Sequence, residues 1–275
     1  MSNSSDRKTY SLFGNSKIKE VPKINNLYMS EIAYMFYCCY YLKKIPEGFT
    51  NTWNWSELQT YKSANAIRAF ESCYSLRYID TNFLKNMGVG IQTSSTYHPY
   101  KQTFLKCFVL DEIPVLGVGK GTITNNVFIG TFENCYRLKR LKFDLNEDGT
   151  PQTVKWKTQT ISLSTVGFGS DAWTFETYMD NDSFGIVDTA TYEAYKDNPD
   201  SWTALVAYSR YNHDSAVETI NSLPDCSAYL ATAGGTNTIK FKGEAGSATD
   251  GGAINTMTEE EIAVATAKGW TVSFV

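Results

Sequence analysis

The sequence predicts an α/β solenoid, in which short parallel strands and short helices stack turn upon turn and a separate segment caps the C-terminal end. Two observations predict this fold. A four-position motif recurs between residues 36 and 141, and a helix with clear start and stop signals precedes a strand between residues 258 and 275. Such a repeat indicates stacking, because one unit cannot bury its own hydrophobic face.

The repeated motif is a Phe followed by Cys three residues later, Leu six later and an aliphatic residue nine later. A fifth, weaker copy, Leu12–Asn15–Ile18–Val21, has Asn in place of Cys. The full copies are Phe36–Cys39–Leu42–Ile45, Phe70–Cys73–Leu76–Ile79, Phe104–Cys107–Leu110–Ile113 and Phe132–Cys135–Leu138–Leu141.

Each copy predicts a helix-like stretch followed by a very short strand. In the stretches 32–36 and 64–70, the Phe and the Cys that follows would share one helical face and turn towards a common interior. The Leu-x-x-aliphatic segment then predicts a strand whose apolar ends point inward. We therefore expect all four motif positions in one continuous core, within a repeat array over residues 1–148.

The six cysteines are expected to be buried free thiols. Four of them share the second motif position, which indicates a packing role. The chain has no Cys-x-x-Cys pair and two His, so the sequence does not predict a zinc site. Free thiols are typical of a protein that matures in a reducing compartment.

The segments 35–46 and 69–79 resemble the BspA-like leucine-rich repeat, in which an Ala-Phe pair, a stretch with Cys, a Leu and a short strand follow one another. The resemblance covers about residues 10–145 and implies an irregular leucine-rich-repeat solenoid. The spacers at 50–64 and 82–102 are longer than the usual unit of the family. We expect them to form outer loops that carry the aromatic residues Trp53, Trp55, Tyr97 and Tyr100.

Residues 149–275 are expected to continue the solenoid and then cap it. Residues 152–167 alternate in polarity as in one or two strands, Ser215–Pro224 has helical spacing, and Thr238–Lys242 predicts a strand.

The last residues predict a capped helix and a final strand. Thr258 and Glu261 form a capping-box pattern, Gly269 ends the helix, and residues 270–275 have strand character. This ending is similar to the termini of repeat proteins from gut bacteria and their phages. A polar helix and strand here would cover the open end of the core.

Charge is spread unevenly along the chain. Residues 1–150 carry 18 basic and 13 acidic residues, whereas residues 151–275 carry 7 and 16. The split fits either two differently solvated faces or a polarised rod whose ends meet unlike surfaces. The basic residues are dispersed, so nucleic acid is not expected as a partner.

No apolar window reaches the roughly 18 residues that a membrane span needs. Residues 1–10 are polar and do not resemble a secretory signal. From these two features we expect a chain without a membrane span, which either is not exported by the secretory route or begins here after a signal.

Catalytic and cofactor-binding patterns are weak, so the chain is predicted not to be an enzyme and to need no cofactor or metal. His98 and His213 are isolated from any nucleophile or carboxylate at motif spacing. The glycines at 117–121 lack the spacing of a phosphate-binding loop. Residues 180–183 lack the Gly and the closing Glu of a calcium loop.

The residues between the inward Leu and aliphatic positions must face outward on the sheet, where they would form a binding surface. Exposed aromatic residues of the first spacer are the other candidate, because Trp and Tyr commonly anchor interfaces. The candidate binding residues are Lys43, Lys44, Arg77, Tyr78, Asp111, Glu112, Lys139, Arg140, Trp53 and Trp55.

Two functions follow as expectations. The similarity of the C-terminal ending to phage-encoded proteins implies a bacteriophage virion component, such as a tail, fibre or baseplate part, that mediates assembly or host recognition. The BspA-like repeats imply, as the alternative, an adhesin on the bacterial cell surface. In either case the expected partners are other virion or surface proteins, or a host receptor or glycan, within a multimeric assembly.

Overall fold

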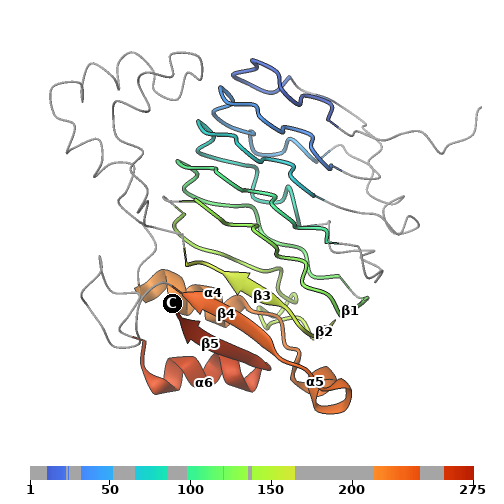
Figure 1. Cartoon of the computed structure of the whole chain (residues 1–275), viewed down its shortest axis with the longest axis vertical. Helices are drawn as coiled ribbons and strands as arrows, with labels where there is room; N and C mark the ends of the chain where they lie inside the picture. The colour runs from blue at the N-terminus through green and yellow to red at the C-terminus, as the bar shows by residue number, and fades with distance from the viewer. Residues whose placement is uncertain are drawn as a thin grey trace, which may run out of the picture.

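The chain winds through turns that lie one above the next along the long axis, and helices and strands follow at the C-terminal end (Figure 1). The computed structural model describes residues 11–22, 24, 32–51, 66–85, 98–119, 121–135, 138–164, 213–241 and 257–275. We call the stacked turns coils and name each after its central phenylalanine, which is Phe13, Phe36, Phe70, Phe104 or Phe132.

Neighbouring coils are joined by hydrogen bonds from alternate residues. In the Phe36 coil the donors are the N–H groups of Tyr34, Phe36 and Cys38. Their acceptors, at 2.8–2.9 Å in the Phe70 coil, are the carbonyl oxygens of Ile67, Ala69 and Glu71. The same three-bond pattern joins each of the first four coils to the next one. Backbone groups that a helix would satisfy internally are thus satisfied between coils.

The prediction of short helices before each Phe is wrong in the described residues of the repeat, where the chain forms successive turns. Each coil has two residues with positive φ, two positions before and two positions after its Phe. In the Phe70 coil these are Arg68 at 53° and Ser72 at 61°. A right-handed helix does not include such residues. Turns and helices both place residues three apart on the same side of the chain. The Phe–Cys spacing therefore fits both structures and did not distinguish between them.

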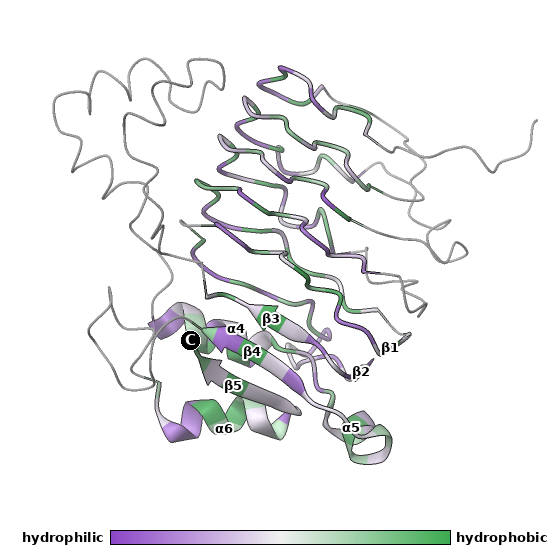
Figure 2. Cartoon of the chain, viewed as in Figure 1, coloured by the Kyte–Doolittle hydropathy of each residue, from purple (hydrophilic) through white to green (hydrophobic). Residues whose placement is uncertain are grey.

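The predicted core is confirmed. All sixteen positions of the four full motif copies are at most 9% exposed, and they belong to one cluster that continues into the C-terminal elements. The central phenylalanine rings stack, with centroids 5.3 Å apart for Phe36 and Phe70, and 5.6 Å apart for Phe70 and Phe104. Figure 2 shows hydrophobic and hydrophilic stretches alternating along each coil.

The cysteines of the motif do more than fill space. The thiol of Cys73 donates to the carbonyl oxygen of Phe36 at 3.1 Å, and that of Cys107 donates to Phe70 at 3.0 Å. All six cysteines are free, and burial raises the pKa of Cys73 and Cys107 well above the usual value. The thiols therefore stay protonated and add a side-chain hydrogen bond between coils.

The weaker fifth copy is shifted by one residue at its start. Phe13 stacks on Phe36 at 5.3 Å, and its carbonyl oxygen accepts from Cys39 at 3.0 Å. Ser16, whose Oγ lies 3.6 Å from the Cys39 sulfur, therefore takes the Cys position that we predicted for Asn15. The Phe13 coil has one residue fewer than the other coils between its central Phe and its bridged residue, Glu20. A motif of fixed spacing therefore placed Leu12 in the Phe position.

Parallel pairing continues beyond the coils. Strand β1 (Thr122–Ile123) pairs with β2 (Lys155–Trp156), and a second sheet has the order β3-β4-β5. Its strands are β3 (Thr160–Ser162), β4 (Asn237–Phe241) and β5 (Trp270–Phe274), all parallel. The helices of this region are α4 (His213–Ser222), α5 (Ser227–Ala233) and α6 (Glu259–Ala267).

Most of these elements were predicted. The helix expected from Ser215 begins two residues earlier as α4, β4 begins and ends one residue before the strand expected at Thr238–Lys242, and β5 lies within the expected segment 270–275. The capping box is confirmed, because the Thr258 hydroxyl accepts from the Glu261 N–H and the Glu261 carboxylate accepts from the Thr258 N–H. Gly269, at φ 81°, follows α6, while α5 has no counterpart among the predicted elements.

Two long side chains tie α4 to the segment after α6. Lys268 Nζ donates to the carbonyl oxygens of Ile220 and Asn221, at 2.8 and 2.7 Å, where α4 ends. The buried indole of Trp270 donates to the Pro224 carbonyl oxygen at 2.9 Å. A cation at a helix C-terminus satisfies carbonyl groups that have no partner within the helix. The C-terminal helices and strands thus form one packed unit.

Candidate interaction surface

The structure brings eight of the ten predicted binding residues together in two neighbouring columns. Backbone hydrogen bonds join the first column, which consists of Lys19, Lys43, Arg77, Asp111 and Lys139. Parallel bridges join Glu20, Lys44, Tyr78 and Glu112, and Arg140 extends this second column through an ion pair with Glu112. We call these ten residues the outward face. Trp53 and Trp55 lie outside the described residues.

The half of the outward face nearer the N-terminus is cationic. Lys19, Lys43, Lys44 and Arg77 are all exposed, and the exposed Glu20 is the one acidic residue of the outward face in this half. Within the described part of the chain, Lys19, Lys44 and Arg77 have no ion-pair partner. Adjacent strands lie about 4.8 Å apart, so stacked cations repel one another across this distance. An anionic partner would relieve that repulsion.

One carboxylate in this half is already occupied by neighbouring donors. Glu47 accepts hydrogen bonds from the Tyr78 hydroxyl, and from the hydroxyl and the N–H of Thr81, the last two at 2.6 and 3.2 Å. These contacts hold the Tyr78 side chain against the turn after the strand. They leave the nearby cations for other contacts.

The half nearer the C-terminus is charge-paired. Glu112 lies 3.0 Å from Arg140 and 3.5 Å from Lys139, and Glu218 lies 3.3 Å from Arg140 and 3.8 Å from Lys142. Burial alone would lower the pKa of Arg140, but Glu112 and Glu218 together raise it. Positive and negative charges thus balance locally in this half.

Helix α4 closes the outward face beside its last strand. The hydroxyl of Thr219 accepts from the Leu141 N–H at 3.4 Å, and that of Ser222 accepts from the Phe143 N–H at 3.3 Å. Side chains of α4 thus accept hydrogen bonds from the last strand. In the rest of the array, the next coil supplies such acceptors. Helix α4 therefore bounds the outward face at the end nearer the C-terminus.

Sequence reasoning missed four residues at or beside this surface. Lys19 and Glu20 were detectable, because they lie between Ile18 and Val21 of the weaker motif copy. Glu47 and Glu218 were not, because each meets its partner only through the fold. Glu218 lies 78 residues beyond Arg140 in the chain.

Searches against protein-family models, curated proteins and solved structures found no match to this chain. The resemblance to BspA-like repeats therefore rests on the sequence motif alone and stays a prediction.

The other sequence candidates have local structural contacts. His98 Nδ1 lies 2.6 Å from the Asn126 carbonyl oxygen, and His213 Nε2 lies 3.0 Å from Glu261. The Gly117 carbonyl oxygen accepts from the buried Tyr100 hydroxyl at 2.9 Å, which places this glycine in the packed interior. Residues 180–183 lie outside the described residues.

Two absences hold for the residues that the structure describes. No group of three or more His, Cys, Asp or Glu side chains comes close enough there to hold a metal ion. No helix in the same ranges has the length and apolarity that crossing a membrane requires.

Proposed function

We propose that the chain is a leucine-rich-repeat solenoid of the BspA-like kind that acts as a binding and structural subunit, and not as an enzyme. We propose further that it belongs to a bacteriophage particle, as a tail, fibre or baseplate part in assembly or host recognition. The observation that carries the binding role is the uneven outward face. In one half Lys19, Lys44 and Arg77 have no ion-pair partner among the described residues, and in the other half ion pairs balance the charges.

The difference between the two halves indicates where a partner would bind. Charges in the paired half already satisfy each other, so a partner there would have to break ion pairs. Lys19, Lys44 and Arg77 have no such pairs to lose in the described residues, and they are exposed. An anionic patch on another virion or surface protein, or an anionic glycan, would gain charge-assisted hydrogen bonds from them.

The placement in a phage particle is supported by the C-terminal ending, which is similar to phage-encoded repeat proteins. The alternative is a bacterial cell-surface adhesin, which the BspA-like motif itself favours. The two proposals share the outward face and differ in where the chain is found.

The location is tested by mass spectrometry of purified virions and of washed envelopes of the producing cells. We expect the chain in the virions at a fixed ratio to the major tail proteins. A chain that is enriched in envelopes and missing from virions would overturn the virion proposal in favour of the adhesin.

The outward face is tested with Arg77→Glu, alongside Lys155→Glu as a matched control on β2 outside this face. We expect Arg77→Glu to lower incorporation into particles or adsorption to host cells at least about tenfold, because a charge reversal opposes an anionic partner. The control should leave both unchanged. Equal effects, or none from Arg77→Glu, would contradict the role of this face.

A further inference from the structure

Two of the hydrogen bonds that join each coil to the next have no counterpart after the Phe132 coil within the described residues. In the first four coils, the residue two positions before the Phe and the Phe itself both donate to the next coil. The corresponding N–H groups of the last coil belong to Gly130 and Phe132, and neither has an acceptor among the described residues. An N–H group without a partner is uncommon in folded proteins.

The segment opposite these donors also has a backbone edge turned towards them. β3 and the residues beside it bond to β4 through Gln159 and Leu163, which accept from Thr238 and donate to Lys240. Successive residues of a strand direct their backbone groups to opposite sides. The N–H and carbonyl groups of Ser162 therefore point away from β4, towards the Phe132 coil.

Side chains keep the two segments apart. Asn126 Oδ1 accepts from the N–H groups of both Phe128 and Thr160, at 3.0 and 3.1 Å. Gln159 Oε1 accepts from the Val127 N–H at 3.0 Å. The backbones are bridged by these amide side chains instead of by direct hydrogen bonds, so they are separated by more than one strand spacing.

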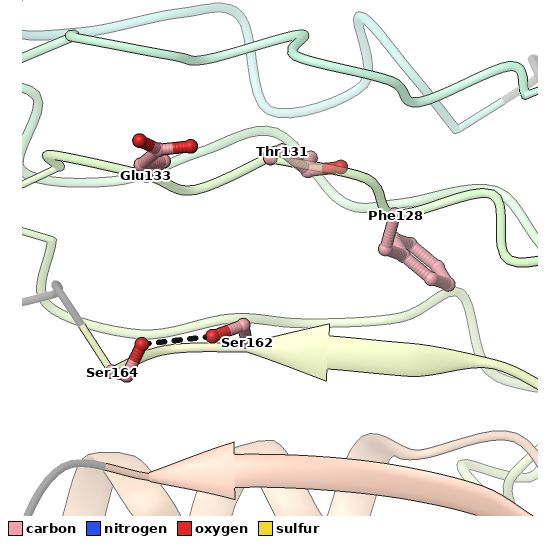
Figure 3. Close-up of a pocket in the computed structure, with 6 residues that line it drawn as sticks. Phe128, Thr131, Glu133, Ser162 and Ser164 are labelled. Carbon is pink, nitrogen blue, oxygen red and sulfur yellow. Dashed lines mark hydrogen bonds between the residues drawn. The ribbon is translucent and has the colours of Figure 1, made fainter. Parts of the chain in front are cut away.

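A pocket of about 220 Å³ lies between the Phe132 coil and β3. It is lined by Phe128, Gly130, Thr131, Glu133, Ser162 and Ser164 (Figure 3). The Ser162 and Ser164 hydroxyls lie 2.9 Å apart on the side of β3 that faces the coil. One water takes up roughly 30 Å³ of liquid, so the pocket is much larger than a single-water site.

We propose that this pocket binds an extended polypeptide segment of a partner protein, which inserts as a strand between the Phe132 coil and β3. The unpaired donors belong to Gly130 and Phe132, two residues apart, and this spacing matches the repeat of a strand. The inserted backbone would accept from these N–H groups on one side and pair with Ser162 on the other. Main-chain pairing of this kind supplies affinity, while side-chain pockets supply specificity.

The lining residues indicate the chemistry of the segment. The exposed carboxylate of Glu133 at the rim favours a Lys or Arg side chain. The Phe128 ring at the other end favours an apolar side chain (Figure 3). This site is separate from the outward face, and the inference holds whether the chain belongs to a virion or to a cell surface.

Amide hydrogen exchange of the full chain tests the premise. We expect the Gly130 and Phe132 amides to exchange at least about tenfold faster than those of Gln102 and Phe104, which occupy the same positions one coil earlier and are hydrogen-bonded. Equal protection at both pairs would show that the ladder is closed and would overturn the proposal.

Binding is tested by selecting peptides from a phage-displayed random library on the full chain. We expect extended sequences with a basic and an apolar residue, and slower exchange at Gly130 and Phe132 in their presence. Ser162→Trp, which fills the pocket, should weaken binding at least about tenfold, whereas Ser273→Trp on β5 should not.

Glu133→Arg is a second test variant, because this side chain is exposed and its replacement leaves the core intact. It should weaken the binding of the basic peptides by a similar factor. The proposal fails if the library yields no binders, or if the selected peptides bind Ser162→Trp and Glu133→Arg as tightly as the unmodified chain.

Discussion

The described coils between residues 11 and 145 and the described C-terminal elements between residues 213 and 275 contribute to one buried core but have different backbones. The described part of the coils consists of turns, with left-handed residues on both sides of each central phenylalanine. The C-terminal elements are helices with caps and strands in a parallel sheet. Local rules determine the second kind of structure, whereas the first depends on hydrogen bonds to the coils above and below.

This difference leads to different responses to mutation. A coil contributes to stability mainly through its neighbours, so a residue matters more when it has a coil on each side. A helix of the C-terminal region depends on its own residues and caps as well.

The largest expected effect is that of Phe70→Ala. Phe70 is fully buried between two stacked rings, so its removal should lower the free energy of unfolding by about 3–5 kcal/mol. Phe13→Ala should cost clearly less, because Phe13 is half-buried and its ring stacks on Phe36 at the start of the described coils. Urea unfolding of both variants measures the difference, and equal losses would argue against cumulative stacking.

Glycine should have opposite effects in the two regions. Lys106 has φ 62°, so Lys106→Gly should remove backbone strain and raise the free energy of unfolding by up to about 1 kcal/mol. Val264→Gly in α6 should lower it by about 1 kcal/mol, because glycine disfavours a helix.

Lys106→Ala is the control for the loss of the side chain, since alanine is strained at positive φ as lysine is. Thermal and urea unfolding of the three variants would measure the effects. A destabilising Lys106→Gly would mean that this position is not left-handed in solution.

The smallest effect concerns pH. The hydrogen bond to Glu261 raises the pKa of His213, and hydrogen bonds from Thr258 and His213 lower that of Glu261. The stabilisation from protonated His213 is therefore fully present below its unfolded pKa, about 6.5, and is lost as the pH rises through the higher folded value. His213→Gln should destabilise the chain by less than about 1 kcal/mol at pH 5.5, and by less again at pH 8.

His213→Lys keeps a positive charge across this range, so its stability should depend less on pH than that of the unmodified chain. Unfolding midpoints at the two pH values would show this. A loss of equal size at both values in His213→Gln would exclude an ionic contribution.

The sequence predicted the C-terminal elements well because their signals are local. Thr258, Glu261 and Gly269 each act within a few residues of their own position, and alternating polarity placed β4 and β5. In the coils, burial was predictable and the backbone was not. The spacing of Phe70 and Cys73 reports which side chains point inward, but the positive φ values of Arg68 and Ser72 have no sequence signal comparable to glycine.

The positions of the outward-facing residues could be predicted from the sequence, but the ion pairs among them could not. The Leu-x-x-aliphatic pattern identified Lys43, Arg77 and their equivalents as outward residues. Arg140 has a second ion pair, with Glu218, which reaches it only once α4 has packed beside the last strand. The pocket beside Ser162 was not predictable either, because it arises from a hydrogen-bond pattern that fails to repeat.

The stacking of the central phenylalanines does not depend on the number of residues between them. These residues are 23, 34, 34 and 28 positions apart in sequence, yet consecutive rings lie 5.3–6.2 Å apart. Doubling the length of a flexible connection costs only about 0.6 kcal/mol in closure entropy. The spacers between coils can therefore be lengthened, shortened or exchanged while the columns keep their order, which makes them natural places for sequence change and for grafting new recognition loops.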